Sequence, residues 1–370
     1  MSLLIFWEPP HLTDSMYPFS LTKRVVDTPI GILTLHQKWD LIFSSISSLK
    51  KKSTFSLSGT LFPSLSVGKI IASLQGGQSL FSADHIWLAT AGSIDSIPKK
   101  FRSTDRILSE PIDQINYPWD LLRLLNSGIA LDVELLTRHR KSMPIPKSVV
   151  RIGTHPIFIS KGASLQACTL NASAGPIYIG EQAEVQEGAH IRGPFMLGHH
   201  SVVTMGARVY GPTAVGECCL IGGEVKRSLL FPYSNKAHDG YMGDSVIGSW
   251  CNWGAGTSNS NLKNTGGVIR IERKGVGFVD VGQKCGVFMG DYSRTAINSS
   301  LNSGSVIGVS AQIGNTEMTP KITRSFQWMD GSRYRIKEAL EHIRNWKALK
   351  GHTLSTDEIE SLKRIFKIDK

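Results

Sequence analysis

The residues of this chain best suited to chemistry lie close together between positions 238 and 256. His238 is followed three residues later by Tyr241, and the turn Gly254–Ala255–Gly256 comes shortly afterwards. A neutral imidazole accepts a proton near pH 7, so His238 is a candidate general base. Backbone N–H groups of Ala255 and Gly256 could donate to an oxyanion. A lone histidine is more often structural, but this grouping predicts an acyl-transfer site with His238 as its base.

These residues belong to a segment with a six-residue repeat. Aliphatic residues recur at intervals of six, and a small residue stands four positions after most of them. The aliphatic positions are Ile179, Val185, Ile191, Leu197, Val203, Val209, Val215 and Ile221, with Ile159 and Leu165 before them and Leu301, Ile307 and Ile313 after them. A period of six fits neither an α-helix nor simple strand alternation. It predicts a parallel β-helix of short strands and tight turns.

The repeat breaks at two places, over residues 222–243 and 259–282. Interruptions in a repeat scaffold map to loops on one side of it, often the binding side. We therefore expect both segments to leave the β-helix as irregular loops, with His238 in the first of them.

Different patterns flank the repeat. Residues 1–143 mix strand-like and helix-like stretches and end near a Pro-rich linker, which predicts an α/β domain. The β-helix is expected over residues 144–328. Residues 329–370 predict two amphipathic helices, the second beginning at a capping box of Ser355 and Glu358. We expect these helices to cap the open end of the β-helix or to pack on a neighbouring subunit.

The composition limits the possible partners. A net charge of +11 suits phosphorylated substrates, but the basic residues form no nucleic-acid-binding motif, so no nucleic acid is expected. The apolar runs are too short to predict a membrane span, and "MSLLIFWEPP" fits a first strand better than a signal peptide. The five cysteines have no metal-ligand spacing and fit small buried residues of a cytoplasmic protein.

Several longer motifs resemble bifunctional GlmU proteins. "GPIYIGEQAEVQEGAHIRGPF", "YSNKAHDGYMGDSVIGSWCNWGAGTSNSNLKN" and "CGVFMGDYSRTAINSSLNSGSVIGVSAQI" look like the solenoid of a divergent subgroup, and "MYPFSLTKRVVDTPIGILTLHQKW" looks like its N-terminal motif. The resemblance extends to about residue 328 and implies a reduced nucleotidyltransferase-like domain before a left-handed β-helix. It implies acetylation of an amino-sugar phosphate such as glucosamine-1-phosphate by acetyl-CoA. Transfer of UMP would then give a nucleotide sugar such as UDP-N-acetylglucosamine. A homotrimer with the site between subunits is also implied.

The resemblance assigns roles to residues of this chain. The catalytic positions are His238, Tyr241 and Asn261; the substrate-binding positions are Arg208, Lys226 and Asn252; and Ala255 and Gly256 would meet acetyl-CoA or the oxyanion. The departure from the family pattern is Leu262, which stands where the family has a tyrosine, so one hydroxyl is missing. No metal is required for acetyl transfer. Because every matched residue follows position 147, residues 147–370 alone are expected to keep this activity.

The nucleotidyltransferase half is less complete. No Gly-rich phosphate loop follows "LLIFW", and no pair of aspartates for Mg²⁺ can be identified. Lys23, Arg24 and Lys38 are candidates to bind nucleotide phosphates, although surface charges are an equal interpretation. Mg²⁺ and UTP or another nucleoside triphosphate are expected only if this domain is active. Two alternatives stay open: a non-catalytic solenoid that binds a nucleotide sugar or a protein, and a sugar-1-phosphate nucleotidyltransferase without acetyl transfer.

Overall fold

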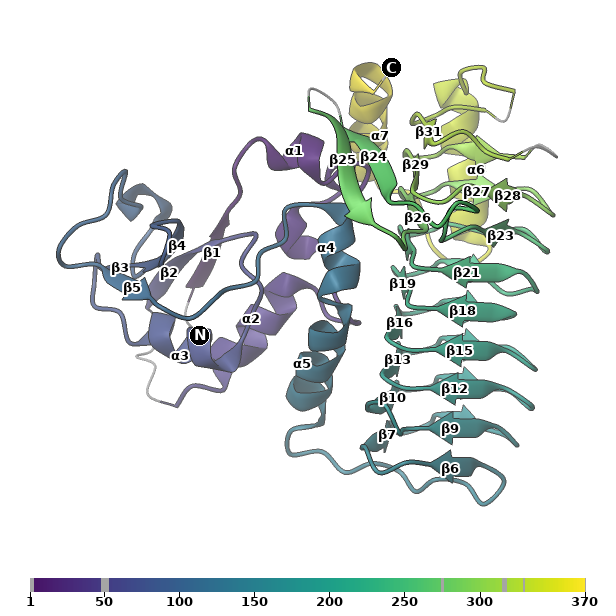
Figure 1. Ribbon diagram of the computed structural model, residues 1–370, viewed down its shortest axis with the longest axis horizontal. Helices are drawn as coiled ribbons and strands as arrows, with labels where there is room; N and C mark the ends of the chain where they lie inside the picture. The colour runs from purple at the N-terminus through teal and green to yellow at the C-terminus, as the bar shows by residue number, and fades with distance from the viewer. Residues whose placement is uncertain (1–2, 48–52, 274–275, 315–317, 329, 370) are drawn as a thin grey trace.

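The computed structural model describes residues 3–47, 53–273, 276–314, 318–328 and 330–369. An N-terminal α/β part lies beside a tall stack of short strands, and two C-terminal helices lie against the later coils of that stack (Figure 1). The expected combination of an α/β part, a β-solenoid and C-terminal helices is confirmed.

The N-terminal part is built around one mixed sheet with the strand order β1-β2-β4-β3-β5. Its strands are β1 (Leu3–Trp7), β2 (Thr54–Ser58), β3 (Ser79–Ser82), β4 (Trp87–Thr90) and β5 (Arg106–Leu108); its helices are α1 (Leu12–Ser15), α2 (Leu35–Ser44), α3 (Leu65–Ala72), α4 (Pro118–Arg123) and α5 (Leu125–Thr137). The pairs β1–β2 and β3–β5 are parallel, and β4 is antiparallel to both of its neighbours. Helix α2 begins at a capping box in which Thr34 and Gln37 bond each other's backbone N–H groups.

The repeat folds into a parallel β-helix with three faces. Face I comprises β7 (Ile157–Ile159), β10 (Ile177–Ile179), β13 (Phe195–Leu197), β16 (Thr213–Val215), β19 (Leu229–Leu230), β22 (Val246–Ile247), β26 (Val287–Met289), β29 (Ser305–Ile307) and β31 (Ile322–Thr323). Face II comprises β8 (Ser164–Leu165), β11 (Glu184–Val185), β14 (Val202–Val203), β17 (Leu220–Ile221) and β20 (Asn235–Lys236), and continues in β27 (Arg294–Thr295) and β30 (Gln312–Ile313). Face III comprises β6 (Val150–Ile152), β9 (Thr169–Asn171), β12 (His190–Arg192), β15 (Arg208–Tyr210), β18 (Glu224–Lys226) and β21 (Tyr241–Gly243), and continues in β23 (Ser258–Asn259) and β28 (Ser300–Leu301).

The six-residue spacing places the predicted aliphatic residues inside this prism. Val185, Val203 and Ile221 are register partners on successive strands of face II, and all three are buried. Each of these coils therefore adds one aliphatic residue to the inner row of face II, which confirms the parallel β-helix. Its left-handed sense remains an expectation of the family resemblance, because the spacing does not determine it.

The two predicted interruptions have different outcomes. Residues 269–282 do leave the β-helix, as an antiparallel hairpin of β24 (Ile269–Arg273) and β25 (Gly277–Gly282). The first expectation is wrong, because residues 222–243 form β18 to β21 in continuous register. Leu230 pairs with Val215, 15 residues earlier, whereas Val215 pairs with Leu197, 18 residues earlier. The coil is shortened at its corners, where residues can be lost without breaking the strand ladders.

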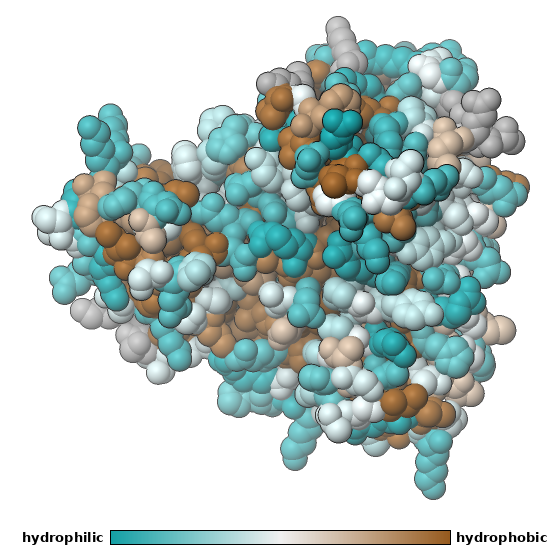
Figure 2. All heavy atoms as spheres, in the orientation of Figure 1, coloured by the Kyte–Doolittle hydropathy of each residue, from teal (hydrophilic) through white to brown (hydrophobic). Residues whose placement is uncertain are grey.

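The N-terminal part covers face I. Outward-facing apolar side chains of this face belong to the same buried core as Trp39, Leu121 and Ile129 of helices α2, α4 and α5. These side chains are Phe158, Tyr178, Met196, Ala214, Leu229, Phe231, Val246, Phe288 and Val306. Figure 1 shows α4 and α5 running beside the ladder of face I, and Figure 2 shows apolar atoms at this junction. The two parts therefore share one apolar core.

The C-terminal helices lie along the side of the β-helix. They are α6 (Ile336–Ala348) and α7 (Thr356–Ile368), and the predicted capping box at Ser355 is confirmed. Trp346 covers the guanidinium of Arg294 on face II at 4.7 Å. The ammonium of Lys350, just beyond α6, donates to the carbonyl of Cys218 several coils earlier. Because their contacts run along several coils, these helices flank face II of their own chain and do not close the open end.

Two further expectations concern the whole chain. None of the described helices combines the length and the hydropathy needed to cross a membrane. All five cysteines carry free thiols, of which Cys168, Cys219, Cys251 and Cys285 are buried and Cys218 is partly exposed. Burial raises the pKa of the Cys219 thiol to about 12, as expected for a packing residue that stays protonated.

Candidate functional site

His238 lies at the corner between faces II and III, in the turn that joins β20 to β21. Its side chain is exposed. Its carbonyl oxygen accepts a hydrogen bond from the ammonium of Lys236 at 2.6 Å. The backbone of the corner is thus held from inside the β-helix while the imidazole is accessible from outside. This arrangement is compatible with a base that must reach a bound molecule.

Arg208 and Tyr241 stand on the outer surface of face III, next to that corner, because each begins its strand. The strand register aligns Arg208 with Glu224 and Glu224 with Tyr241. Neighbouring strands are about 4.8 Å apart, so these side chains form one column. The guanidinium of Arg208 lies 3.7 Å from the carboxylate of Glu224 and remains half exposed. The predicted base and Arg208 therefore lie at one edge of the prism, whereas Lys226, the register partner of Tyr210 and Gly243, stands two residues further along the outer surface of face III.

Tyr241 is held by a polar network. Its hydroxyl accepts a hydrogen bond from the side-chain amide of Asn261 at 3.0 Å, and the same amide donates to the carboxylate of Asp244. Asp244 is almost fully buried and pairs with Arg227. The phenol lies over Gly243, where a Cβ atom would come within 2.2 Å of its oxygen. Asn261 therefore orients Tyr241, and glycine at 243 leaves room for the ring.

The turn expected to hold an oxyanion stacks directly on the His238 corner. The N–H of Gly256 donates to the carbonyl of Asp239 at 3.1 Å, and the N–H of Gly254 donates to the Thr295 hydroxyl at 2.9 Å. Both donors are already engaged, so Gly256 does not fit the predicted oxyanion role. The N–H of Ala255 is the remaining donor of this turn.

Asn252 is placed differently from the other predicted substrate residues. It bridges between Asn235 and Arg294 in the outer row of face II. Arg208 and Lys226 belong to face III. Asn252 can therefore reach a ligand of the His238 corner only from the adjoining face.

The structure adds one residue that the sequence did not indicate. Lys236 occupies an inner row of face II, following Ile221 in register, and is 2% exposed. Burial lowers the pKa of its ammonium to about 8; the nearby charge of Asp239 opposes this shift, and that of Arg208 reinforces it. A cation inside an apolar prism is costly unless it has partners. Its bond to the His238 carbonyl holds the backbone of this corner in place.

The N-terminal candidates are mostly engaged in other contacts. Lys38 is fully buried in an ion pair with Asp132, which also accepts the N–H of Ile32 at 2.7 Å. Burial lowers the pKa of Lys38 and raises that of Asp132. Lys38 is therefore a structural residue, and its placement is incompatible with the predicted role on a nucleotide. Lys23 pairs with Asp291 of the β-helix at 2.8 Å, so its charge ties the two parts together.

Arg24 is the predicted N-terminal cation that stays half exposed. It lines a cavity of about 330 Å³ at the end of β1, together with Lys23 and Glu8. The carboxylate of Glu8 accepts the N–H groups of Val25 and Val26 at 3.1 and 2.8 Å. The Glu8 carboxylate thus already accepts hydrogen bonds from backbone N–H groups of the kind that bind phosphate in nucleotide-binding loops. Among the described residues, no three His, Cys, Asp or Glu side chains are arranged to hold a metal ion.

Comparisons with known proteins agree with this two-part organisation. Residues 4–141 match the family model described as sugar nucleotidyl transferase. The chain is 39% identical over 141 residues to a bifunctional sugar-1-phosphate nucleotidylyltransferase/acetyltransferase of Sulfurisphaera tokodaii, covering 38% of this chain and 35% of that protein. It is 35% identical over 91 residues to the bifunctional protein GlmU of Methanocaldococcus jannaschii, covering 25% of this chain and 22% of that protein. The matched parts thus span about a third or less of these relatives.

Among solved structures, the UDP-N-acetylglucosamine acyltransferase of Arabidopsis is similar over 60% of this chain and 88% of the acyltransferase chain. The sequence identity is 15% and the TM-score is 0.29. Residues 4–141 are thus similar to the sugar nucleotidyl transferase family, and parts of the chain are similar to bifunctional nucleotidylyltransferase/acetyltransferases and to GlmU proteins.

Proposed function

We propose that the chain is an acetyl-CoA-dependent N-acetyltransferase that acts on an amino-sugar phosphate. The observation that carries this proposal is the grouping of an exposed His238 with Arg208 and Tyr241 at one edge of the β-helix, with Lys226 two residues further along the outer surface of face III. The two cations suit a phosphate, and the histidine suits an amine that must lose a proton. Similarity to bifunctional relatives supports the same reaction class.

In the proposed reaction, the substrate amine attacks the thioester carbonyl of acetyl-CoA. The imidazole of His238 takes the proton that the amine loses as the new C–N bond forms. The Ala255 N–H donates to the oxyanion of the tetrahedral intermediate. The C–S bond then breaks, and the coenzyme A thiolate leaves and recovers the proton from the imidazolium. The products are the N-acetylated sugar phosphate and free coenzyme A, and no metal takes part.

A His238→Ala variant tests the base. Loss of a positioned general base should lower kcat by about 10²–10⁴ and leave KM for acetyl-CoA little changed, because the imidazole acts on the amine. Lys226→Ala should instead raise KM for the sugar phosphate. The assay follows free thiol from acetyl-CoA with a panel of amino-sugar phosphates. His155→Ala, which removes an exposed histidine at another turn of the β-helix, is the matched control. A folded His238→Ala protein with full activity would leave a non-catalytic binding solenoid as the better interpretation.

Nucleotidyl transfer by the N-terminal part is a second candidate, supported by the family match over residues 4–141. The pairing of Lys23 with Asp291, the burial of Lys38 and the Glu8 contacts weigh against it, since they leave Arg24 as the exposed predicted cation. The test is release of pyrophosphate from UTP with N-acetylglucosamine-1-phosphate and Mg²⁺. Turnover that Arg24→Ala abolishes would establish this activity.

We further propose that a second copy of the chain completes the acetyl-transfer site, in a homotrimer. The N-terminal part covers face I and the C-terminal helices lie against the later coils of face II, whereas no described element covers face III (Figure 1). Met205 and Ile297 are 71% and 69% exposed at the corner of faces II and III, on coils before and after His238. Exposed apolar residues beside an open site are typical of an interface.

A further inference from the structure

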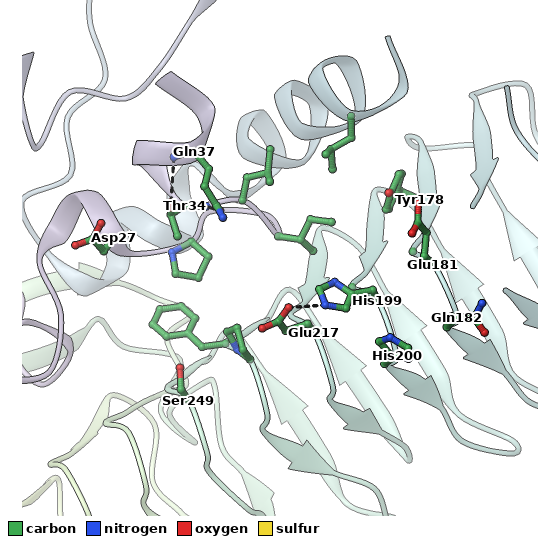
Figure 3. A pocket seen from close by; sticks show the side chains of 18 of the residues that line it. Asp27, Thr34, Gln37, Tyr178, Glu181, Gln182, His199, His200, Glu217 and Ser249 are labelled. Carbon is green, nitrogen blue, oxygen red and sulfur yellow. Dashed lines mark hydrogen bonds and ion pairs between the residues drawn. The ribbon is translucent and has the colours of Figure 1, made fainter. Parts of the chain in front are cut away.

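A separate cavity of about 540 Å³ lies between the N-terminal part and the β-helix. Its wall on the β-helix side follows the corner of faces I and II and carries His199 and Glu217, and its opposite wall carries Thr34 and Gln37 at the start of α2 (Figure 3). Its volume lies in the range of small-molecule sites. The His238 corner is a different edge of the prism, so this cavity is not part of the proposed acetyl-transfer site.

The polar groups of the cavity are ordered before any ligand arrives. The Nε2 atom of His199 lies 2.6 Å from the carboxylate of Glu217. On the opposite wall, the side-chain oxygen of Gln37 accepts the N–H of Thr34 at 2.8 Å, which leaves its NH₂ group as a donor. The cavity therefore offers fixed donors and acceptors on two sides, as recognition of hydroxyl groups requires.

The charges of the cavity argue against a phosphorylated ligand. Its one lysine, Lys23, is already paired with Asp291, and the carboxylate of Glu181 pairs with Arg140 at 3.0 Å. The described lining residues thus include no lysine or arginine left free to bind phosphate, and of the two lining histidines His199 faces the Glu217 carboxylate while His200 has no such partner. Together with Glu217, they favour a ligand that is neutral or positively charged.

Apolar side chains complete the wall between these polar groups. Ile32 and Leu33 contribute from the N-terminal part, and Phe231 and Tyr178 contribute from face I. A ring compound with polar edges and C–H faces matches a cavity with polar rims and an apolar wall. Sugars have this distribution of groups.

We propose that this cavity binds a sugar ring without a phosphate group and that the ring contacts both parts of the chain. The carboxylate of Glu217 accepts from a ring hydroxyl or amine, and the amide of Gln37 donates to a hydroxyl from the other side. This proposal does not depend on acetyl transfer.

Isothermal titration of the full chain with glucose, glucosamine and glucose-1-phosphate tests the proposal, because these probes share one ring and differ in charge. Glucose and glucosamine should bind, and the affinity for glucose-1-phosphate should be at least about tenfold lower. Glu217→Gln should weaken glucose binding about tenfold, and Leu33→Trp, which fills the cavity, should abolish it. His238→Ala should leave glucose binding unchanged, so this result stands or falls separately from acetyl transfer. Absence of glucose and glucosamine binding, equal affinity for glucose-1-phosphate, or unaltered glucose binding by Glu217→Gln would each overturn the proposal.

Discussion

Replacing Lys236 by methionine should remove a measurable pH dependence from the stability of this protein. Methionine keeps the unbranched side chain inside the β-helix and removes the ammonium. In the folded chain the pKa of Lys236 is about 8, below its ordinary value of 10.5. The folded state therefore binds fewer protons than the unfolded state between these values. Stability must rise with pH through this window, since the charged form is penalised only in the folded chain.

The size of the effect follows from the two pKa values. With about 8 in the folded state and about 10.5 in the unfolded state, the Lys236 contribution destabilises the fold by about 3 kcal/mol at pH 7 and by about 2 kcal/mol at pH 9. Wild type should therefore gain about 1 kcal/mol relative to Lys236→Met over this interval. The variant also loses the charged hydrogen bond to the His238 carbonyl, worth about 1.5–3 kcal/mol. The net change at pH 7 is therefore small, but kcat should fall because the corner is less well held.

Urea unfolding of both proteins at pH 7 and pH 9 measures this difference, because every other titrating group is common to the two chains. Lys226→Met, which removes an exposed lysine from face III, is the matched control and should follow wild type within about 0.5 kcal/mol at both pH values. Equal pH dependence in wild type and Lys236→Met would show that the ammonium is not buried as described. The account of the His238 corner would then be wrong.

Two further outcomes are expected. Asp132→Ala leaves the Lys38 ammonium buried without its carboxylate partner, so it should lower the free energy of unfolding measured with urea by about 3–5 kcal/mol. Lys38→Met combined with Asp132→Leu should recover part of that loss, and an Asp132→Ala protein as stable as wild type would contradict the burial of this ion pair. Light scattering at micromolar concentration should give the mass of a trimer, and Met205→Glu with Ile297→Glu should dissociate it, because both side chains are exposed beside the open site; a monomeric wild type would count against the shared site.

The sequence was sufficient wherever structure depends on a local pattern. The six-residue series from Ile179 to Ile221 predicted the inner rows of the β-helix, and these residues are buried as expected. Ser355 and Glu358 predicted the start of α7 for the same reason, since a capping box involves residues three positions apart. Each inference needed only a few neighbouring residues and the geometry of one element.

Other features depend on partners far away in the chain. Lys38 and Asp132 are 94 residues apart, so nothing near Lys38 indicated that its charge would be buried. The inward position of Lys236 could not be predicted from the sequence for a related reason. The shortened coil moves it out of the six-residue phase, so the stretch around His238 was interpreted as a loop when it forms strands. A loss of three residues from a coil changes the pattern but not the ladder of hydrogen bonds.

The shared core also changes how the N-terminal part must be understood. Phe231 and Phe288 project outward from face I and are buried by this part of the chain, and each contributes about 1.5–3 kcal/mol through burial. A fragment of residues 147–370 would expose this whole face to water. The expectation that the fragment alone keeps acetyl transfer therefore conflicts with the packing. An N-terminal part that performed no reaction would still have a structural role, because its helices bury the apolar side chains of face I.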